Sequence, residues 1–313
     1  MVNKLNVEMF YDYFDEIANL LYNSYQKSYL EGMNEAFNFL LDDQFEGEYS
    51  LEDNALFIEI KSRISEISFD REEIRKSVQL GILKGYKHAS IPNSMITPDT
   101  IGLFMGYLIE KLYQNQTLNS IFDPLIGSGN LVYTILNYLQ KSLKVYGVDH
   151  DLLKCKLARN TGDLLDIDNE IFYQDSLTYY DQGFDLVVTD MPLKADEANY
   201  FPYMVLNHHA ECLVEGGFLL ALIDNDFFEQ KDNEIFKQEI STKCHIFGLI
   251  KLSETLFKLN PKSILILQKK GSKIEVPKKF LLVDLPSFND VEDFNNTINI
   301  IDKWFEERKG DIL

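Results

Sequence analysis

Long apolar runs, a leader-like N-terminus and clustered cysteines are all lacking in this sequence of 313 residues. No apolar run approaches the ~20 residues that a membrane-spanning helix needs. The opening residues, MVNKLNVEMFYDYFDE, lack the basic flank and apolar stretch of a signal peptide. The three cysteines, Cys155, Cys212 and Cys244, are too few and too widely spaced for a disulfide framework or a metal cluster. These absences predict a cytoplasmic protein without a metal site.

Positive charge is also scarce, with 30 lysines and arginines against 50 acidic residues and a formal net charge of -20. The overall field therefore does not drive the chain onto a polyanion. The charge is uneven, because residues 1–60 hold 13 acidic residues and 2 lysines, whereas residues 251–280 hold 8 lysines and 2 glutamates. Net charge alone therefore does not exclude a nucleic-acid partner.

Residues 1–90 are predicted to form a helical domain. Apolar residues recur at helical spacing in YFDEIANLLYNSYQKSYLEGMNEAFNFLLD and in EEIRKSVQLGILKGY. A new helix is then expected in SMITPDTIGLFMGYLIEKL, with Thr97 as its N-cap and Pro98 in its first position. We expect a second domain over residues 91–313.

From residue 119 onward, apolar strand segments alternate with helical segments. Such alternation predicts an α/β fold with a mostly parallel sheet. Only SETLFKLNP separates the last two of the seven core segments, so an antiparallel edge strand is expected there. The core strand segments are SIFDP, KVYGVD, EIFYQD, FDLVVTD, GFLLALID, CHIFGLIKL and KSILILQKK. A late strand in KKFLLVDLPSF and a terminal helix are expected after them.

The segment IFDPLIGSGNLVYTIL carries the strongest local signal for a ligand. Asp123 ends a strand, and Gly127 and Gly129 precede an apolar helix. Glycines let the backbone approach a ligand closely, and the start of a helix supplies free N–H groups. Asp149 ends the next strand 20 residues after Gly129 and can accept hydrogen bonds from ribose hydroxyls. Together these features predict a cofactor that contains a nucleoside.

S-adenosylmethionine fits this pattern better than a dinucleotide. The third glycine of the dinucleotide motif is missing from GSGNLVY. An acidic residue before the glycine loop is typical of S-adenosylmethionine sites, and Asp123 holds that position. Asp175, at a third strand end, can accept from the adenine amino group, although a capping role is about as good an explanation for this residue alone.

In this order, DPLIGSGNL, VYGVD, YQDSL and FDLVVTDMPL resemble the class I S-adenosylmethionine-dependent methyltransferases, specifically those that methylate adenine N6 in DNA. SMITPDTIGLFMGYLI is similar to the cofactor-pocket helix of the modification subunits of type I restriction systems. A YtxK-like branch of the group pairs this Rossmann-like core with N-terminal helices. The resemblance covers roughly residues 90–270.

The resemblance implies a role for each matching position. Asp123, Gly127 and Gly129 would line the methionine end of the cofactor. Asp149 would hold the ribose and Asp175 the adenine. Thr97 and Pro98 would border the pocket. The catalytic motif of these enzymes is Asp, Asn or Ser, then two prolines and an aromatic residue, and Asp190 and Pro192 match its first and third positions.

The catalytic motif departs from the family at two positions. Met191 replaces the first proline, which removes a fixed φ, and Leu193 replaces the aromatic residue that stacks on a flipped base. Tyr200, Phe201 and Tyr203 follow and could supply a ring, although packing at a helix start explains them better.

Lys258 and Lys262 flank the connection between the last two core strands. They are the best candidates in the sequence for contact with a phosphate.

Three functions follow from these residues and this resemblance. The first is methylation of adenine N6 in DNA, with Asp190 orienting the amine. The second is binding of S-adenosylmethionine with a degenerate catalytic loop and a regulatory or interaction role. The third is methyl transfer to RNA or protein. A protein partner could bind the N-terminal helices.

Overall fold

The computed structural model describes residues 2–92, 96–192, 200–257 and 260–307. Leu193 and Lys258 lie outside this part of the chain. The described helices are α1 (Lys4–Tyr25), α2 (Tyr29–Asp42), α3 (Leu51–Ser62), α4 (Arg71–His88), α5 (Asp99–Leu112), α6 (Asn130–Leu139), α7 (Leu152–Leu164), α8 (Phe201–His209), α9 (Asn233–Lys243) and α10 (Val291–Glu307). Short 3₁₀ turns cover η2 (Ser176–Thr178), η3 (Phe227–Glu229) and η4 (Glu254–Leu256).

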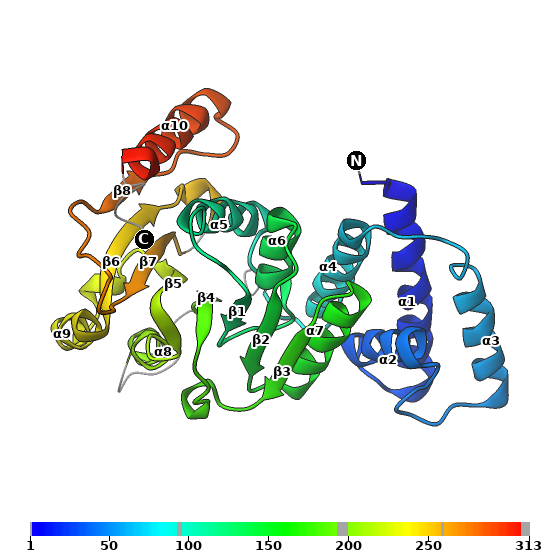
Figure 1. Ribbon diagram of the computed structural model, residues 1–313. Helices are drawn as coiled ribbons and strands as arrows, with labels where there is room; N and C mark the ends of the chain where they lie inside the picture. The colour runs from blue at the N-terminus through cyan, green and yellow to red at the C-terminus, as the bar shows by residue number, and fades with distance from the viewer. Residues whose placement is uncertain (1, 93–95, 193–199, 258–259, 308–313) are drawn as a thin grey trace.

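The strands form one sheet with the order β3-β2-β1-β4-β5-β7-β6-β8 (Figure 1). They are β1 (Ser120–Asp123), β2 (Lys144–Asp149), β3 (Asn169–Tyr173), β4 (Phe184–Asp190), β5 (Leu213–Asp224), β6 (Cys244–Lys251), β7 (Lys262–Lys269) and β8 (Leu281–Asp284). The sheet is parallel except at β7, which is antiparallel to both of its neighbours. The predicted α/β fold with a mostly parallel sheet is confirmed.

Two details of the sheet differ from the prediction. The antiparallel strand lies between β5 and β6 instead of at the edge, and the sheet has eight strands instead of seven. The connection through α9 leaves one strand position free between β5 and β6. A short connection after β6 then brings the chain back, and β7 occupies that position. The expected late strand, β8, then pairs with the outer side of β6.

Helices cover both faces of the sheet. One face packs against α5, α6, α7 and α10, and the other packs against α8 and α9. The core strands are buried on both sides, as in GFLLALID, where every residue from Gly217 to Ile223 is buried. Such continuously apolar strands are typical of a parallel sheet between two layers of helices.

The N-terminal helices α1–α4 lie beyond the β3 edge of the sheet, with α7 between them and the strands (Figure 1). Leu157 of α7 is 1% exposed and belongs to the core of α1–α4. Asn160 donates from its side-chain amide to the oxygens of Asn34 (3.0 Å) and Asn38 (2.7 Å) of α2. The helical segment therefore shares a buried interface with the α/β part.

Within the described ranges, no helix combines the length and apolar character needed to span a bilayer.

The candidate cofactor and acceptor site

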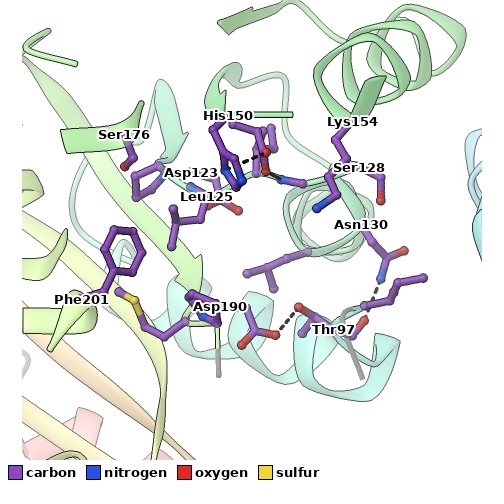
Figure 2. A pocket seen from close by; sticks show the side chains of 18 of the residues that line it. Thr97, Asp123, Leu125, Ser128, Asn130, His150, Lys154, Ser176, Asp190 and Phe201 are labelled. Atoms are coloured by element: carbon purple, nitrogen blue, oxygen red, sulfur yellow. Dashed lines mark hydrogen bonds and ion pairs between the residues drawn. The ribbon is translucent and has the colours of Figure 1, made fainter. Parts of the chain in front are cut away.

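A cavity of about 490 Å³ opens at the carboxyl ends of the parallel strands (Figure 2). It lies where β1 and β4 are neighbours and the strand order reverses, which is where ligands bind in open α/β sheets. Seven of the nine predicted site residues line it: Thr97, Asp123, Gly127, Asp149, Asp175, Asp190 and Pro192. Pro98 and Gly129 are not among the lining residues and adjoin those that are.

The glycine loop between β1 and α6 uses its two glycines differently. Gly127 has a φ of +54°, in the left-handed region, and a Cβ placed on it would have no atom of the described residues within 4 Å. Gly129 has a φ of +86° and caps α6, and a Cβ there would lie 2.3 Å from the ring of Tyr133. Gly127 thus provides room at the cavity, whereas Gly129 permits the sharp entry into the helix.

Asp149 is fixed by two backbone amides. Its Oδ2 accepts from the N–H of Gly127 (3.0 Å), and its Oδ1 accepts from the N–H of Asp151 (2.9 Å). A carboxylate has about four acceptor sites, so the held side chain keeps lone pairs for a ligand hydroxyl. The side chain of His150 lies 3.5 Å from the same carboxylate.

Asp123 and Asp175 have contrasting environments. Asp123 is 2% exposed and accepts from the N–H of Leu125 (2.9 Å). Burial raises the pKa of Asp123 to about 8, and the nearby carboxylates of Asp190 and Asp149 act in the same direction. Asp175 is exposed and caps the η2 turn through the N–H of Leu177 (2.9 Å), so it both caps this turn and lines the cavity.

Thr97 does not cap α5, contrary to the prediction. The helix begins at Asp99 with Pro98 as its N-cap, because the hydroxyl of Thr97 is used elsewhere. That hydroxyl donates to Oδ2 of Asp190 at 2.7 Å, and the carbonyl of Thr97 accepts from the side chain of Asn130 (2.7 Å). Thr97 therefore joins the glycine-loop helix to the end of β4.

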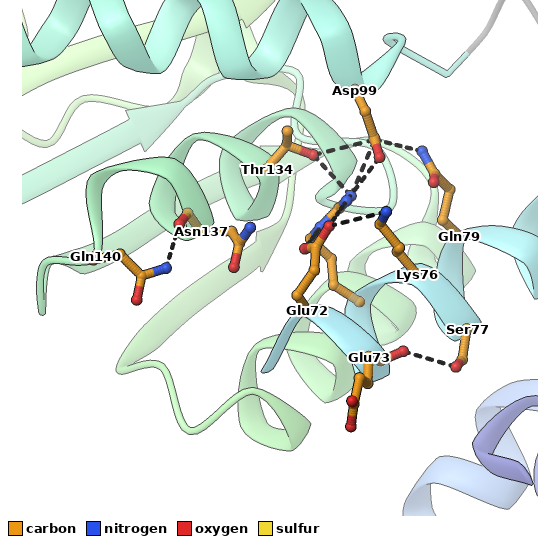
Figure 3. Close-up of polar contacts among 10 residues, drawn as sticks. Glu72, Glu73, Lys76, Ser77, Gln79, Asp99, Thr134, Asn137 and Gln140 are labelled. Carbon is orange, nitrogen blue, oxygen red and sulfur yellow. Dashed lines mark hydrogen bonds and ion pairs between the residues drawn. The ribbon is translucent and has the colours of Figure 1, made fainter. Parts of the chain in front are cut away.

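A buried arginine anchors the start of α5 to the N-terminal helices. Figure 3 labels three of its partners, Glu72, Asp99 and Thr134. Arg75 of α4 is 4% exposed and donates to both carboxylate oxygens of Asp99 (3.0 and 2.7 Å). It also donates to both oxygens of Glu72 and to the hydroxyl of Thr134 on α6. Asp99 lies two residues after Thr97, so this network holds the segment that contacts Asp190.

The carboxylate of Asp190 is held from two sides. Thr97 occupies Oδ2, and the ammonium of Lys262 forms an ion pair with Oδ1. The same ammonium donates to the carbonyl of Met191 at 2.9 Å, and Lys262 is only 6% exposed. The interpretation of Lys262 as a phosphate contact is therefore wrong, because its charge is buried against Asp190. Lys258 lies outside the described residues.

The aromatic residues after the loop divide into two groups. Tyr200 and Tyr203 pack on each other and on Phe227, as their place at a helix start suggested. Phe201 is half-buried and lines the cavity together with Met191. It is the described ring nearest in sequence to the motif position of Leu193 that also faces the cavity.

Several lining residues were not predicted from the sequence. Ser128 and Asn130 could have been inferred from their place in the glycine loop, and Ser176 from its neighbour Asp175. No sequence signal indicated Tyr86 of α4 or Lys154 of α7, which only the packing of these helices brings to the cavity.

The donor set suits the predicted cofactor. Ligand cavities usually enclose ≈ 300–1,000 Å³, and about 490 Å³ lies within that range. The cavity has an open glycine position at Gly127 and an aspartate at the end of each of β1 and β2.

Comparisons with known proteins agree with this geometry. Residues 83–310 match the N-6 DNA Methylase family, and residues 8–86 match the YtxK N-terminal helical domain. The uncharacterized protein YtxK of Bacillus subtilis strain 168 is 32% identical over 98% of this chain and 100% of its own length.

Solved structures show the same relationship. A Listeria monocytogenes protein assigned to the class I S-adenosylmethionine-dependent methyltransferases has a TM-score of 0.87 at 30% identity, over 97% of this chain and 100% of that one. The methyltransferase subunit of a type I restriction-modification system from Streptococcus thermophilus shares the fold, with a TM-score of 0.58 at 13% identity over 95% and 74% of the two chains. The chain therefore belongs to the N-6 DNA methylase family of S-adenosylmethionine-dependent methyltransferases and carries the YtxK-type helical domain at its N-terminus.

Proposed function

We propose that this protein methylates the N6 amino group of adenine in DNA in the cytoplasm. One observation carries the proposal: the carboxylate of Asp190 and the carbonyl of Met191 lie side by side, joined by one ammonium, at the cavity that contains the predicted cofactor residues. A carboxylate and a carbonyl are the two acceptors needed to orient an amine with two hydrogens. The family match supports adenine as the base that carries this amine.

Residues on different walls of the cavity would hold different parts of the cofactor. Asp123 and Gly127 would hold the methionine end, with Gly129 shaping the same loop. Asp149 would accept from the ribose hydroxyls, and Asp175 from the adenine amine. Thr97 and Pro98 would border the pocket at the start of α5. We also propose residues 1–90 and 91–313 as the two domains.

The main contribution of the protein to the reaction would be to orient the reacting groups. S-adenosylmethionine supplies a methyl group on a positively charged sulfonium. The exocyclic amine of adenine is a weak nucleophile because its lone pair is delocalised into the ring. Asp190 and Met191 would accept hydrogen bonds from its two N–H groups and direct its lone pair at the methyl carbon, which makes the step effectively unimolecular. The methyl carbon would exchange its bond to sulfur for a bond to nitrogen, S-adenosylhomocysteine would leave, and one N–H proton would pass to water. Pro192 would shape the loop, and the base would reach the cavity by leaving its stack.

A second function remains a candidate because Lys262 already binds both acceptors. If that ammonium blocks every incoming amine, the protein would bind S-adenosylmethionine and act through a partner, for which the acidic N-terminal helices are the candidate surface. RNA and protein amides are alternative acceptors.

The test is transfer of a labelled methyl group from S-adenosylmethionine to unmethylated genomic DNA, to RNA and to protein. We expect label in DNA, recovered as N6-methyladenine after digestion. Binding of the cofactor in calorimetry without label in any acceptor would support the regulatory function. Absence of binding to the folded protein would overturn both functions.

Proton release should accompany cofactor binding. Since the pKa of Asp123 is about 8, this side chain is mostly protonated at pH 6.5 in the free protein. A cationic ligand favours the ionised carboxylate, so binding below pH 8 should release a proton. The affinity should rise by up to about tenfold for each unit by which the pH increases towards 8. Calorimetry in two buffers of different ionisation enthalpy measures this release. Asp123→Asn should lose it, and an unchanged release in this variant would contradict the role of Asp123.

A further inference from the structure

The chain has Met191 where its family has a rigid proline, yet hydrogen bonds hold the backbone of Met191. The N–H of Met191, which a proline would lack, donates to the carbonyl of Leu222 on β5 at 3.0 Å. The carbonyl of Met191 accepts from Lys262. Met191 itself is 2% exposed. Both backbone polar groups of Met191 are therefore engaged, and these hydrogen bonds replace the ring as the restraint on this residue.

We propose that Lys262 is a positioning residue that locks the side chain of Asp190 and the carbonyl of Met191 into one acceptor pair. This inference rests on the function proposed above and explains how the loop could work without its first proline. One ammonium contacts both oxygens, so the distance between the two oxygens and their relative orientation depend on the position of this ammonium.

The lysine comes from a rigid part of the sheet. Lys262 is the first residue of β7 and pairs with Asp224 of β5, and its carbonyl accepts from the N–H of Leu252 (3.0 Å). Strands β5 and β6 therefore hold the backbone on both sides, and the side chain reaches from there to the end of β4. Sites built on strands are held more accurately than sites built on loops.

The alternative is that the ammonium blocks the site and leaves when an amine arrives. Removing one partner from a largely buried ion pair leaves the other charge without compensation. Two hydrogen bonds from a neutral amine compensate for that loss only in part, because a neutral donor binds a carboxylate more weakly than an ammonium does. Displacement of Lys262 is therefore unfavourable. An amine can instead bind with Lys262 in place, because the carbonyl has two lone pairs and the carboxylate about four.

The test replaces Lys262 by methionine, which has a similar length and no charge. Lys269→Met is the matched control, because Lys269 ends the same strand and donates to the carbonyl of Ala210 (2.8 Å), away from the cavity. Hydrogen exchange of the Met191 amide reports on the loop without any need for turnover. In Lys262→Met, we expect this amide to exchange at least about tenfold faster, with Val148 of β2 unchanged. The control should match the parent at both amides.

Methyl transfer adds a second readout that general loss of stability would not produce. Lys262→Met should lower kcat at least about tenfold, because Asp190 is left unpaired. The double variant Lys262→Met/Asp190→Asn should recover part of kcat, since an asparagine is uncharged and its amide can donate to the carbonyl of Met191.

Each outcome decides between the two explanations. Faster exchange at Met191 with partial recovery in the double variant supports the positioning role. Unchanged exchange at Met191 overturns it, and a higher kcat in Lys262→Met identifies a block instead. If the parent protein transfers no methyl group to any acceptor, the adenine proposal fails, while the exchange experiment still judges the role of Lys262.

Discussion

Replacing Asp190 by alanine is expected to lower methyl transfer to DNA by about 10²–10³-fold, the usual cost of losing one oriented polar group at a reacting atom. The variant removes the oxygen that would accept a hydrogen of the amine and leaves Lys262 and Thr97 without their shared partner. Binding of S-adenosylmethionine should persist, because Asp149 and the glycine loop are held by contacts that do not involve Asp190.

The measurement is single-turnover transfer of labelled methyl groups at saturating cofactor, with calorimetry of cofactor binding on the same samples. Asp284→Ala is the control, because Asp284 ends β8 and is exposed away from the cavity. The thermal transition is recorded for each variant, since Lys262 loses its buried ion pair in Asp190→Ala. Transfer that survives in folded Asp190→Ala would remove the proposed role of Asp190.

Replacing Arg75 by methionine should cost about 3 kcal/mol of the free energy of unfolding, the value for losing one partner of a buried ion pair. Arg75 is 4% exposed, and its removal takes away the cation that joins Asp99 to Glu72. Glu72 keeps the longer ion pair with Lys76, at 3.6 Å. The partial exposure of both carboxylates, at 26% and 20% of the side chain, lets water offset some of this loss and places the effect at the lower end of the range.

Urea unfolding of the whole chain measures this cost. Arg63→Met is the matched control, because Arg63 also joins two carboxylates, Glu16 and Glu59, but its side chain is 48% exposed. Exposed ion pairs contribute little to stability because water and salt screen them, so the control should change the midpoint little. Equal losses in the two variants would mean that Arg75 holds α4 to α5 no better than a surface contact does.

The gathering of the candidate cofactor residues at one cavity could be predicted because their signals are local. A strand end, a glycine loop and a helix start occupy neighbouring positions in the sequence, and parallel strands bring Asp123 and Asp149 to one edge of the sheet whatever else the chain does. The same reasoning ordered Asp175 and Asp190 along that edge.

The contacts around Asp190 could not be predicted, because they depend on residues that are distant in the sequence. Lys262 reaches Asp190 across 72 positions only because β7 enters the sheet beside β5, and the expectation of an edge strand concealed this. Thr97 reads as a helix cap in the sequence, since nothing local reveals that Asp190 competes for its hydroxyl. The hydrogen-bond partner of such a polar side chain is set by the fold, because a distant segment of the chain supplies it.

Helix α7 links the two parts of the chain, although a separate family model matches each part. One side of α7 packs on the sheet, and on its other side Leu157 belongs to the core of α1–α4 and Asn160 donates a hydrogen bond to Asn34 of α2, so the N-terminal helices complete their core with a helix of the α/β part. Two segments that share buried contacts in this way are expected to unfold together. Neither segment can be replaced by that of another protein without disturbing the packing of the other. A ligand held by Asp149, at the start of α7, would therefore stabilise the distant N-terminal helices by mass action as strongly as it stabilises the sheet.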